Sequence, residues 1–165
     1  MSPKLTTHNS AIAGGGVFAR EDITEGEVLV RWGGGLYSTA QINNGETNDQ
    51  TACQIGEDLY IADPPGTELK DSDLMNHSCE PNAWMADEVT IIAKRDIVVG
   101  EEVTADYVLW VADPGYVTIA ECRCGSTLCR GRITGDDWRI AELQERYKGH
   151  WPPYLQYRIN KKSLV

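Results

Sequence analysis

Four cysteines with the spacing of metal ligands are the residues of this sequence best suited to chemistry. Cys122, Cys124 and Cys129 form a Cys-x-Cys-x4-Cys pattern, which is much narrower than a lone pair of cysteines. Neighbours this close do not easily form a disulfide with each other, but they can place two thiolates on one ion. Cys79 is the natural fourth ligand. Four cysteine ligands leave no open coordination position, so the predicted zinc site is structural.

Three other segments carry groups that could bind a ligand or take part in a reaction. Gly14, Gly15 and Gly16 precede a strand-like run and allow close approach of the backbone to a ligand, although a plain hairpin turn is the default interpretation. The Asn76-His77 pair offers an amide and an imidazole, and a lone His is more often structural than functional. Tyr107 could donate or accept a hydrogen bond through its phenol.

Composition limits the class of partner. The 165 residues predict one domain, and the formal net charge of −10 makes a nucleic-acid surface improbable, because phosphate binding draws on clustered Lys and Arg. A basic partner fits better, although the charge could equally serve only solubility. No stretch approaches the roughly 20 apolar residues of a membrane span. We expect a soluble intracellular protein that binds no membrane, cytoplasmic if bacterial and nuclear if eukaryotic, with Cys53 as a buried core thiol.

Short apolar runs closed by Gly, Pro, Asn or Asp predict a mainly β domain with many turns. The expected strands are 16–19, 28–32, 52–55, 59–62, 83–85, 89–93 and 102–105. Residues 36–50 predict a polar loop with at most a short helix. One helix is expected over about 136–148, with Gly149 as its left-handed C-terminal cap. Residues 150–154 should stop it, and a tail reaching Lys161-Lys162 follows.

Taken together, the motifs Asn76-His77-Ser78-Cys79-Glu80-Pro81-Asn82, Gly100 to Tyr107 and Cys122 to Gly131 closely resemble a SET-domain protein lysine methyltransferase with a post-SET zinc-binding segment. The resemblance covers residues 11–132 and suggests a minimal, stand-alone member, such as a bacterial one. It implies a β-clip-like fold of small curved sheets with a pseudoknot, in which the Asn-His segment is threaded beneath the segment ending at Tyr107. The implied domains are SET at 11–110, post-SET at 111–133, and a C-terminal helix and tail at 134–165.

The resemblance also implies roles for individual residues. S-adenosylmethionine would be held in a cleft, Tyr107 would be the catalytic Tyr, and zinc would be structural. The implied cofactor-binding residues are Gly14, Gly15, Gly16, Asn76, His77, Tyr107 and Leu128, with Ile133 as a second candidate to cover the adenine. The implied zinc ligands are Cys79, Cys122, Cys124 and Cys129.

Two positions depart from the family pattern. Asp73 stands where many members have an Arg that meets the cofactor carboxylate. Ala105 stands where many carry Phe or Tyr to limit how many methyl groups are added, so the lysine channel is expected to be roomy unless Trp84 or Met85 fills it.

The function implied is methyl transfer from S-adenosylmethionine to a lysine of a basic, histone-like protein tail, with S-adenosylhomocysteine as the product. The acidic chain would attract such a partner. Two alternatives stay open: a non-catalytic module of the same fold that binds a basic peptide, and an unrelated zinc-stapled adaptor.

Overall fold

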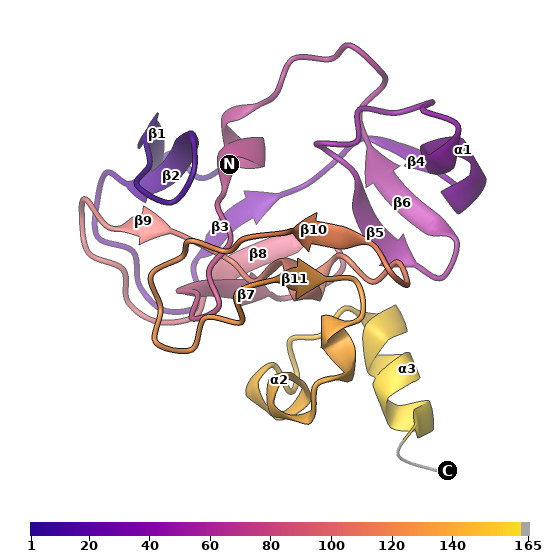
Figure 1. Ribbon diagram of the computed structural model, residues 1–165. Coiled ribbons are helices and arrows are strands. Elements are labelled where there is room, and N and C mark those ends of the chain that lie inside the picture. The colour runs from indigo at the N-terminus through magenta and orange to yellow at the C-terminus, as the bar shows by residue number, and fades with distance from the viewer. Residues whose placement is uncertain (163–165) are drawn as a thin grey trace.

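The computed structural model describes residues 1–162, and within them the strands form four small antiparallel sheets, with two of the three α-helices near the C-terminus (Figure 1). Three sheets have three strands each: β1 (Leu5–Asn9), β2 (Gly15–Ala19) and β9 (Glu102–Val103); β3 (Val28–Arg31), β8 (Thr90–Ala93) and β7 (Ala83–Met85); and β4 (Gly35–Tyr37), β6 (Leu59–Ala62) and β5 (Cys53–Gly56). The fourth sheet pairs β10 (Val117–Ile119) with β11 (Ile133–Thr134). The mainly β fold is confirmed.

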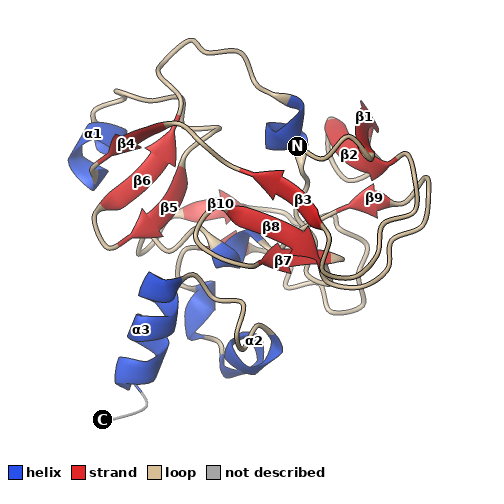
Figure 2. Ribbon diagram, turned by 180° about the vertical axis from the view of Figure 1, so that it is seen from behind, coloured by secondary structure: helices blue, strands red, loops and turns tan. Residues whose placement is uncertain are grey.

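Helical structure is short except at the C-terminal end. The α-helices are α1 (Thr39–Asn43), α2 (Ala141–Arg146) and α3 (Pro153–Lys162), and 3₁₀ helices cover Asp71–Leu74, Tyr107–Leu109 and Asp137–Arg139. Figure 2 shows α3 and α2 together at one end of the molecule, away from β1, β2 and β9. Among residues 1–162, no helix combines the length and apolar character needed to cross a bilayer.

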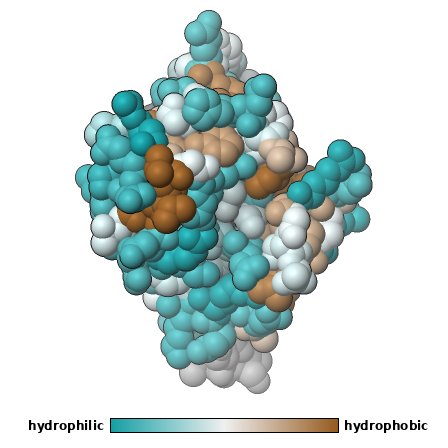
Figure 3. Space-filling model, turned by 90° about the vertical axis from the view of Figure 1, so that its left-hand side faces the viewer, coloured by the Kyte–Doolittle hydropathy of each residue, from teal (hydrophilic) through white to brown (hydrophobic). Residues whose placement is uncertain are grey.

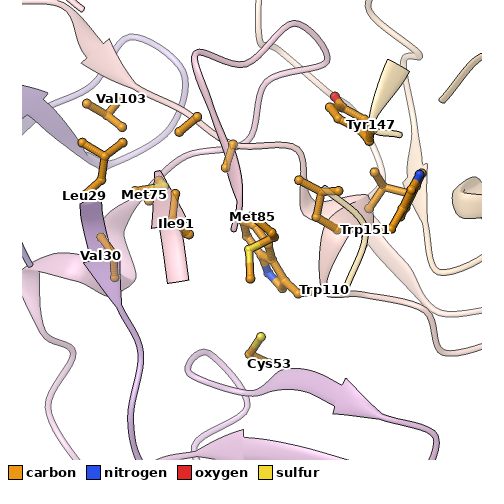
Figure 4. Packing of buried hydrophobic residues seen from close by; sticks show 14 of the residues in the cluster. Leu29, Val30, Cys53, Met75, Met85, Ile91, Val103, Trp110, Tyr147 and Trp151 are labelled. Carbon is orange, nitrogen blue, oxygen red and sulfur yellow. The ribbon is translucent and has the colours of Figure 1, made fainter. Parts of the chain in front are cut away.

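One apolar core joins three of the sheets to the C-terminal segment. Leu29, Ile91 and Met85 from the β3-β8-β7 sheet are buried, and Trp110 and Tyr147 extend this cluster toward the C-terminal helices (Figure 4). The surface shown in Figure 3 is mostly hydrophilic, with hydrophobic residues in small separate patches. The apolar side chains that the strand pattern predicted to be internal therefore hold the sheets together.

The Asn-His segment is threaded against the residues that directly follow β9. The backbone N–H of Ser78 donates to the carbonyl of Ala105 at 3.1 Å, and the N–H of Ala105 donates to the carbonyl of Asn76 at 3.1 Å. Ala105 also forms a parallel bridge with Ala83. Residues 76–78 and 105 are thus fixed side by side, which is the crossing that the predicted pseudoknot requires.

The expected strands agree closely with the structure, but four strands escaped prediction. β1 is largely polar and only partly buried, so it lacks apolar alternation. β4, β10 and β11 have two or three residues each, too few to show a period. The loop over 36–50 does carry one short helix, α1.

The prediction of one continuous helix over about 136–148 is wrong, because the structure has two separate helical segments there. Ile140 has extended backbone, with ψ of 118°, and separates the 3₁₀ helix from α2. Trp138 and Leu143 are both buried, yet five residues on an ideal helix differ by about 140° in direction. The break lets both side chains reach the core. Gly149 has a positive φ of 84°, as expected for a left-handed residue.

Residues 150–152 are not helical, as expected for a segment that ends the preceding helix, but the tail expected after them is wrong because α3 begins within this segment. Pro153 is the first residue of α3, a position where its missing N–H loses no helical hydrogen bond. Tyr154, Leu155 and Ile159 are buried on one face of this helix. The last part of the expected tail, residues 163–165, lies outside the described residues.

Candidate active site

A cavity of about 1020 Å³ lies between the β4-β6-β5 sheet, the Tyr107 segment and β10. Its volume is at the upper end of the usual range for small-molecule sites, roughly 300–1,000 Å³. The side chains that line it include a group of aromatic residues and three carboxylates: Trp32, Tyr60, Tyr107, Trp110 and Tyr116, with Asp49, Asp73 and Asp113. The cavity is therefore both aromatic and acidic.

Tyr107 lies at this cavity with its hydroxyl held in one direction. The hydroxyl donates to the carbonyl of Met75 at 2.8 Å, and the ring packs edge-on against His77 with centroids 5.3 Å apart. Burial raises the pKa of Tyr107 to about 12, so the phenol is neutral near pH 7. Because its proton is committed to Met75, the oxygen keeps lone pairs that can accept a hydrogen bond from a ligand.

Two tryptophans stand beside Tyr107. Trp32 and Trp110 meet edge-on with ring centroids 4.9 Å apart, and Trp110 lies 5.3 Å from Tyr107. Aromatic faces attract ammonium and methylammonium groups. Trp32 comes from the end of β3 and Trp110 follows the 3₁₀ helix of Tyr107, so the cluster depends on two segments that are far apart in sequence.

The charge of the cavity has one sign. Asp49, Asp73 and Asp113 line it, and none of the described lining residues is Lys or Arg. Asp113 accepts a hydrogen bond from the hydroxyl of Tyr60. Asp73 accepts one from the backbone N–H of Lys70 at 2.8 Å. A cationic ligand would therefore meet complementary charge.

Asn76 holds the glycine loop. Its side-chain amide donates to the carbonyls of Ala13 at 3.2 Å and Gly15 at 3.0 Å, and to the Glu102 carboxylate at 2.8 Å. A Cβ on Gly16 would lie 2.4 Å from the same carboxylate. The structure thus brings the predicted glycines and Asn76 together, and their packing against Glu102 explains the small residue at Gly16.

His77 is turned inward. Its Nδ1 accepts a hydrogen bond from the backbone N–H of Tyr107 at 3.2 Å, and its Nε2 lies 3.3 Å from the sulfur of Cys79. Burial lowers the pKa of His77 to about 4, which keeps the ring neutral near pH 7. The side chain therefore connects the cysteine cluster to the segment that positions Tyr107.

The four predicted cysteines converge. The sulfurs of Cys79, Cys122, Cys124 and Cys129 all lie within 4.8 Å of one another. Tetrahedral zinc with bonds of about 2.3 Å would set the sulfurs about 3.8 Å apart, so a small contraction would complete the site. Backbone N–H groups of Arg130 and Gly131 donate to the sulfurs of Cys79 at 3.3 Å and Cys129 at 3.4 Å, contacts that stabilise bound thiolates. The donor set fits structural zinc.

Several predicted site residues lie elsewhere. Leu128 is 46% exposed and does not line the cavity. Ala105 is fully buried within the threaded crossing and does not line this cavity. Trp84 stacks on His150 with centroids 3.5 Å apart, and Met85 is a core residue. The structure brings none of the three expected channel residues, Ala105, Trp84 and Met85, to this cavity, because β7 faces the C-terminal segment.

Sequence reasoning missed the aromatic and acidic lining. Trp32 is the last residue before three consecutive glycines, and Trp110 and Asp113 follow closely after Tyr107. Their proximity to a recognised motif was the available signal. Nothing in their local pattern distinguishes a cavity residue from a core residue, since Trp110 is also 9% exposed and packs in the core.

Comparison with known proteins identifies related chains. The family model described as "SET domain" matches residues 14–108. Histone-lysine N-methyltransferase ASHH2 of Arabidopsis thaliana is 30% identical over 153 residues, which cover 81% of this chain and 8% of the relative. The H3 lysine-4 specific histone-lysine N-methyltransferase of Schizosaccharomyces pombe is 30% identical over 133 residues, or 72% of this chain and 14% of the relative. The chain thus spans only a small part of these relatives.

A solved structure also resembles this chain. The crystal structure of KRYPTONITE in complex with mCHG DNA and SAH superimposes with a TM-score of 0.61 at 26% identity, covering 78% of this chain and 28% of that one. The small antiparallel sheets, the threaded crossing and the matched residues agree with the resemblance seen in the motifs. This chain belongs to the SET-domain family.

Proposed function

We propose that this chain transfers methyl groups from S-adenosylmethionine to a lysine side chain of a basic protein. The observation that carries the proposal is the position of Tyr107, which lines a cavity of about 1020 Å³ with aromatic and acidic walls and whose hydroxyl is anchored to the carbonyl of Met75. Histone-lysine N-methyltransferases among the relatives, and SAH in the KRYPTONITE structure, support the same reaction.

The cofactor would be held by the glycine loop at Gly14 to Gly16, the backbone of Asn76 and His77, and Tyr107. When bound, S-adenosylmethionine supplies an electrophilic methyl group on a positively charged sulfur. Asp73 stands beside this region in place of a basic residue, and it lines the cavity. A structural zinc ion on the four cysteines would keep residues 122–129 against Cys79, three residues from Asn76.

The target lysine must arrive as a neutral amine. Desolvation and the positive sulfur of the bound cofactor would disfavour the ammonium form at the point of transfer, against the attraction of the cavity's carboxylates. The Tyr107 oxygen can accept an N–H of the amine and so direct the nitrogen lone pair. The new N–C bond forms as the methyl leaves sulfur, and one ammonium proton passes to solvent. The faces of Trp32 and Trp110 suit the methylated ammonium product.

The substrate class follows from charge. Three carboxylates and no described Lys or Arg line the cavity, and the whole chain has a formal net charge of −10. A peptide with basic residues around the target lysine, such as a histone tail, would be attracted. The DNA in the KRYPTONITE structure is bound by a protein of which this chain covers 28%, and the acidic charge opposes phosphate binding here.

The test is a methylation assay with mass detection. Purified protein and S-adenosylmethionine are incubated with a panel of lysine peptides, each paired with a Lys→Arg version and with a version whose flanking basic residues are replaced by Glu. We expect methyl transfer to basic peptides alone. Cofactor and peptide binding without transfer would instead favour the non-catalytic binding module. A gel-shift assay with duplex DNA should show no complex.

A further inference from the structure

Helix α3 lies outside the residues matched by the family model, yet it packs directly against β5 (Figures 1 and 2). Its inward face buries Tyr154, Leu155 and Ile159. The helix therefore lies against the outer side of a strand whose Cys53 lines the cavity.

Arg158 of α3 contacts two separate segments. Its Nε donates to both oxygens of Glu57, at 2.9 and 3.0 Å, and its Nη1 donates to the carbonyl of Ala112 at 3.3 Å. The guanidinium also lies over the rings of Tyr154 and Trp138, at 5.4 and 5.7 Å from their centroids. Five donors in a planar fork allow Arg, unlike Lys, to make these contacts at the same time.

Each of these two segments adjoins residues that line the cavity. Glu57 is in the turn between β5 and β6, which supply Cys53 and Tyr60 to one wall, and Ala112 lies between Val111 and Asp113 of the other. The walls also meet directly, because the N–H of Gln54 donates to the carbonyl of Trp110 at 3.2 Å and the Tyr60 hydroxyl donates to Asp113. Arg158 joins the same walls from the outside.

We propose that Arg158 is a positioning residue that fixes the separation of the two cavity walls and thereby the affinity for the lysine peptide. The peptide part of this inference rests on the proposed function. Among the hydrogen bonds of residues 1–162 that join the β5-β6 hairpin to residues 110–113, those of Gln54 and Tyr60 would remain without the guanidinium.

The Arg158–Glu57 ion pair is not expected to contribute much to the free energy of unfolding. The Arg158 side chain is 20% exposed and that of Glu57 is 58% exposed, and pairs of this kind contribute little to global stability. The effect expected from the geometry is local. Loosening one wall against the other should change peptide binding more than unfolding or cofactor binding.

The experiment compares Arg158→Gln and Glu57→Gln with Arg139→Gln. Arg139 is the matched control, since it also lies over Trp138, at 5.3 Å, but it pairs with Asp136 at 3.2 Å instead of contacting Glu57 and Ala112. Five quantities are measured on the whole chain: hydrogen exchange of the Gln54 amide, the Kd of a basic peptide with one central lysine, the Kd of S-adenosylmethionine, and kcat and KM for the peptide.

We expect faster exchange at Gln54 and a roughly fivefold rise in peptide Kd and KM in both cavity-wall variants, with cofactor Kd and kcat close to wild type. Arg158→Lys should recover part of the loss. Unchanged exchange at Gln54 would overturn the positioning role, and faster exchange with unchanged peptide Kd would overturn its link to binding. A wild-type chain that binds the peptide but transfers no methyl group would contradict the proposed function alone, because the exchange and Kd measurements do not depend on turnover.

Discussion

Arg130 and Asp106 form a largely buried, bidentate ion pair that joins the cysteine cluster to the segment of Tyr107. The guanidinium donates to the two oxygens of Asp106 at 2.7 and 2.8 Å, and Asp106 is fully buried. Arg130 directly follows the ligand candidate Cys129, and Asp106 directly precedes Tyr107. The Tyr147 hydroxyl, from the C-terminal segment, also donates to Asp106 at 2.9 Å.

Removing the cation should strongly destabilise the fold. Arg130→Gln leaves the Asp106 carboxylate buried without its ion-pair partner, and we expect a loss of about 3 kcal/mol in the free energy of unfolding. Asp106→Asn in the same chain should recover part of this loss, which a double-mutant cycle in urea measures. Arg132, which is exposed, provides the control as Arg132→Gln. Equal stability of Arg130→Gln and the control would contradict the importance of the pair.

Tyr107→Phe separates a catalytic role from a structural one. The change keeps the ring but deletes the hydroxyl that binds Met75, so stability should fall by about 1 kcal/mol. If the oxygen orients the amine, single-turnover methyl transfer should fall by roughly two orders of magnitude while cofactor affinity stays the same. The exposed Tyr157 gives the control, Tyr157→Phe. Near-normal transfer by the Tyr107 variant would refute the catalytic assignment.

The cysteine cluster should bind one zinc ion per chain. Cys124→Ser is expected to lower both zinc content and methyl transfer while most of the β core stays folded, because Cys124 lies outside the hydrophobic core. A chelator should remove zinc together with cofactor binding. Cys53 is not one of the four candidate ligands, so the Cys53→Ala chain should still bind one zinc ion. Metal analysis by mass spectrometry checks this, and a metal-free variant with full activity would exclude the proposed role.

Gly135 should tolerate no side chain. A Cβ there would lie 2.0 Å from the carbonyl oxygen of Asp113, which lines the cavity. Gly135→Ala must displace that backbone, so we expect a loss of about 2 kcal/mol in stability and weaker peptide binding. Gly33→Ala is the control, since its Cβ would meet nothing within 4 Å. Thermal melting of both variants measures the difference, and matching curves would show that residues 113 and 135 are not packed as described.

Stability should decline in alkaline solution. Burial raises the pKa of Tyr107 from 10 to about 12, and burial also raises the pKa values of Tyr147 and Tyr154. Below pH 10 these phenols are protonated in both states. Above pH 10 the unfolded chain loses protons that the folded chain retains, so the free energy of unfolding falls as pH rises toward 12. Urea unfolding on either side of pH 10 checks this, and the decline should be smaller in Tyr107→Phe.

The sequence alone determined the elements and motifs that depend on local spacing. Seven strands followed from short apolar runs between turn residues, and the family followed from ordered motifs around Asn76, Tyr107 and Cys124. The convergence of the four cysteines followed from ligand spacing, because three of them lie within eight residues. Such features are predictable since each depends on a few adjacent residues.

Tertiary packing decided what lines the cavity and how the C-terminal segment folds. Trp32 and Trp110 line the cavity although neither was expected there, and Ala105 is fully buried in the threaded crossing. Residues 153–162 form a helix because β5 and Trp138 offer an apolar surface for Tyr154 and Leu155, a partner that no local pattern reveals. These outcomes depend on contacts between segments far apart in the chain, where burial overrides local preference.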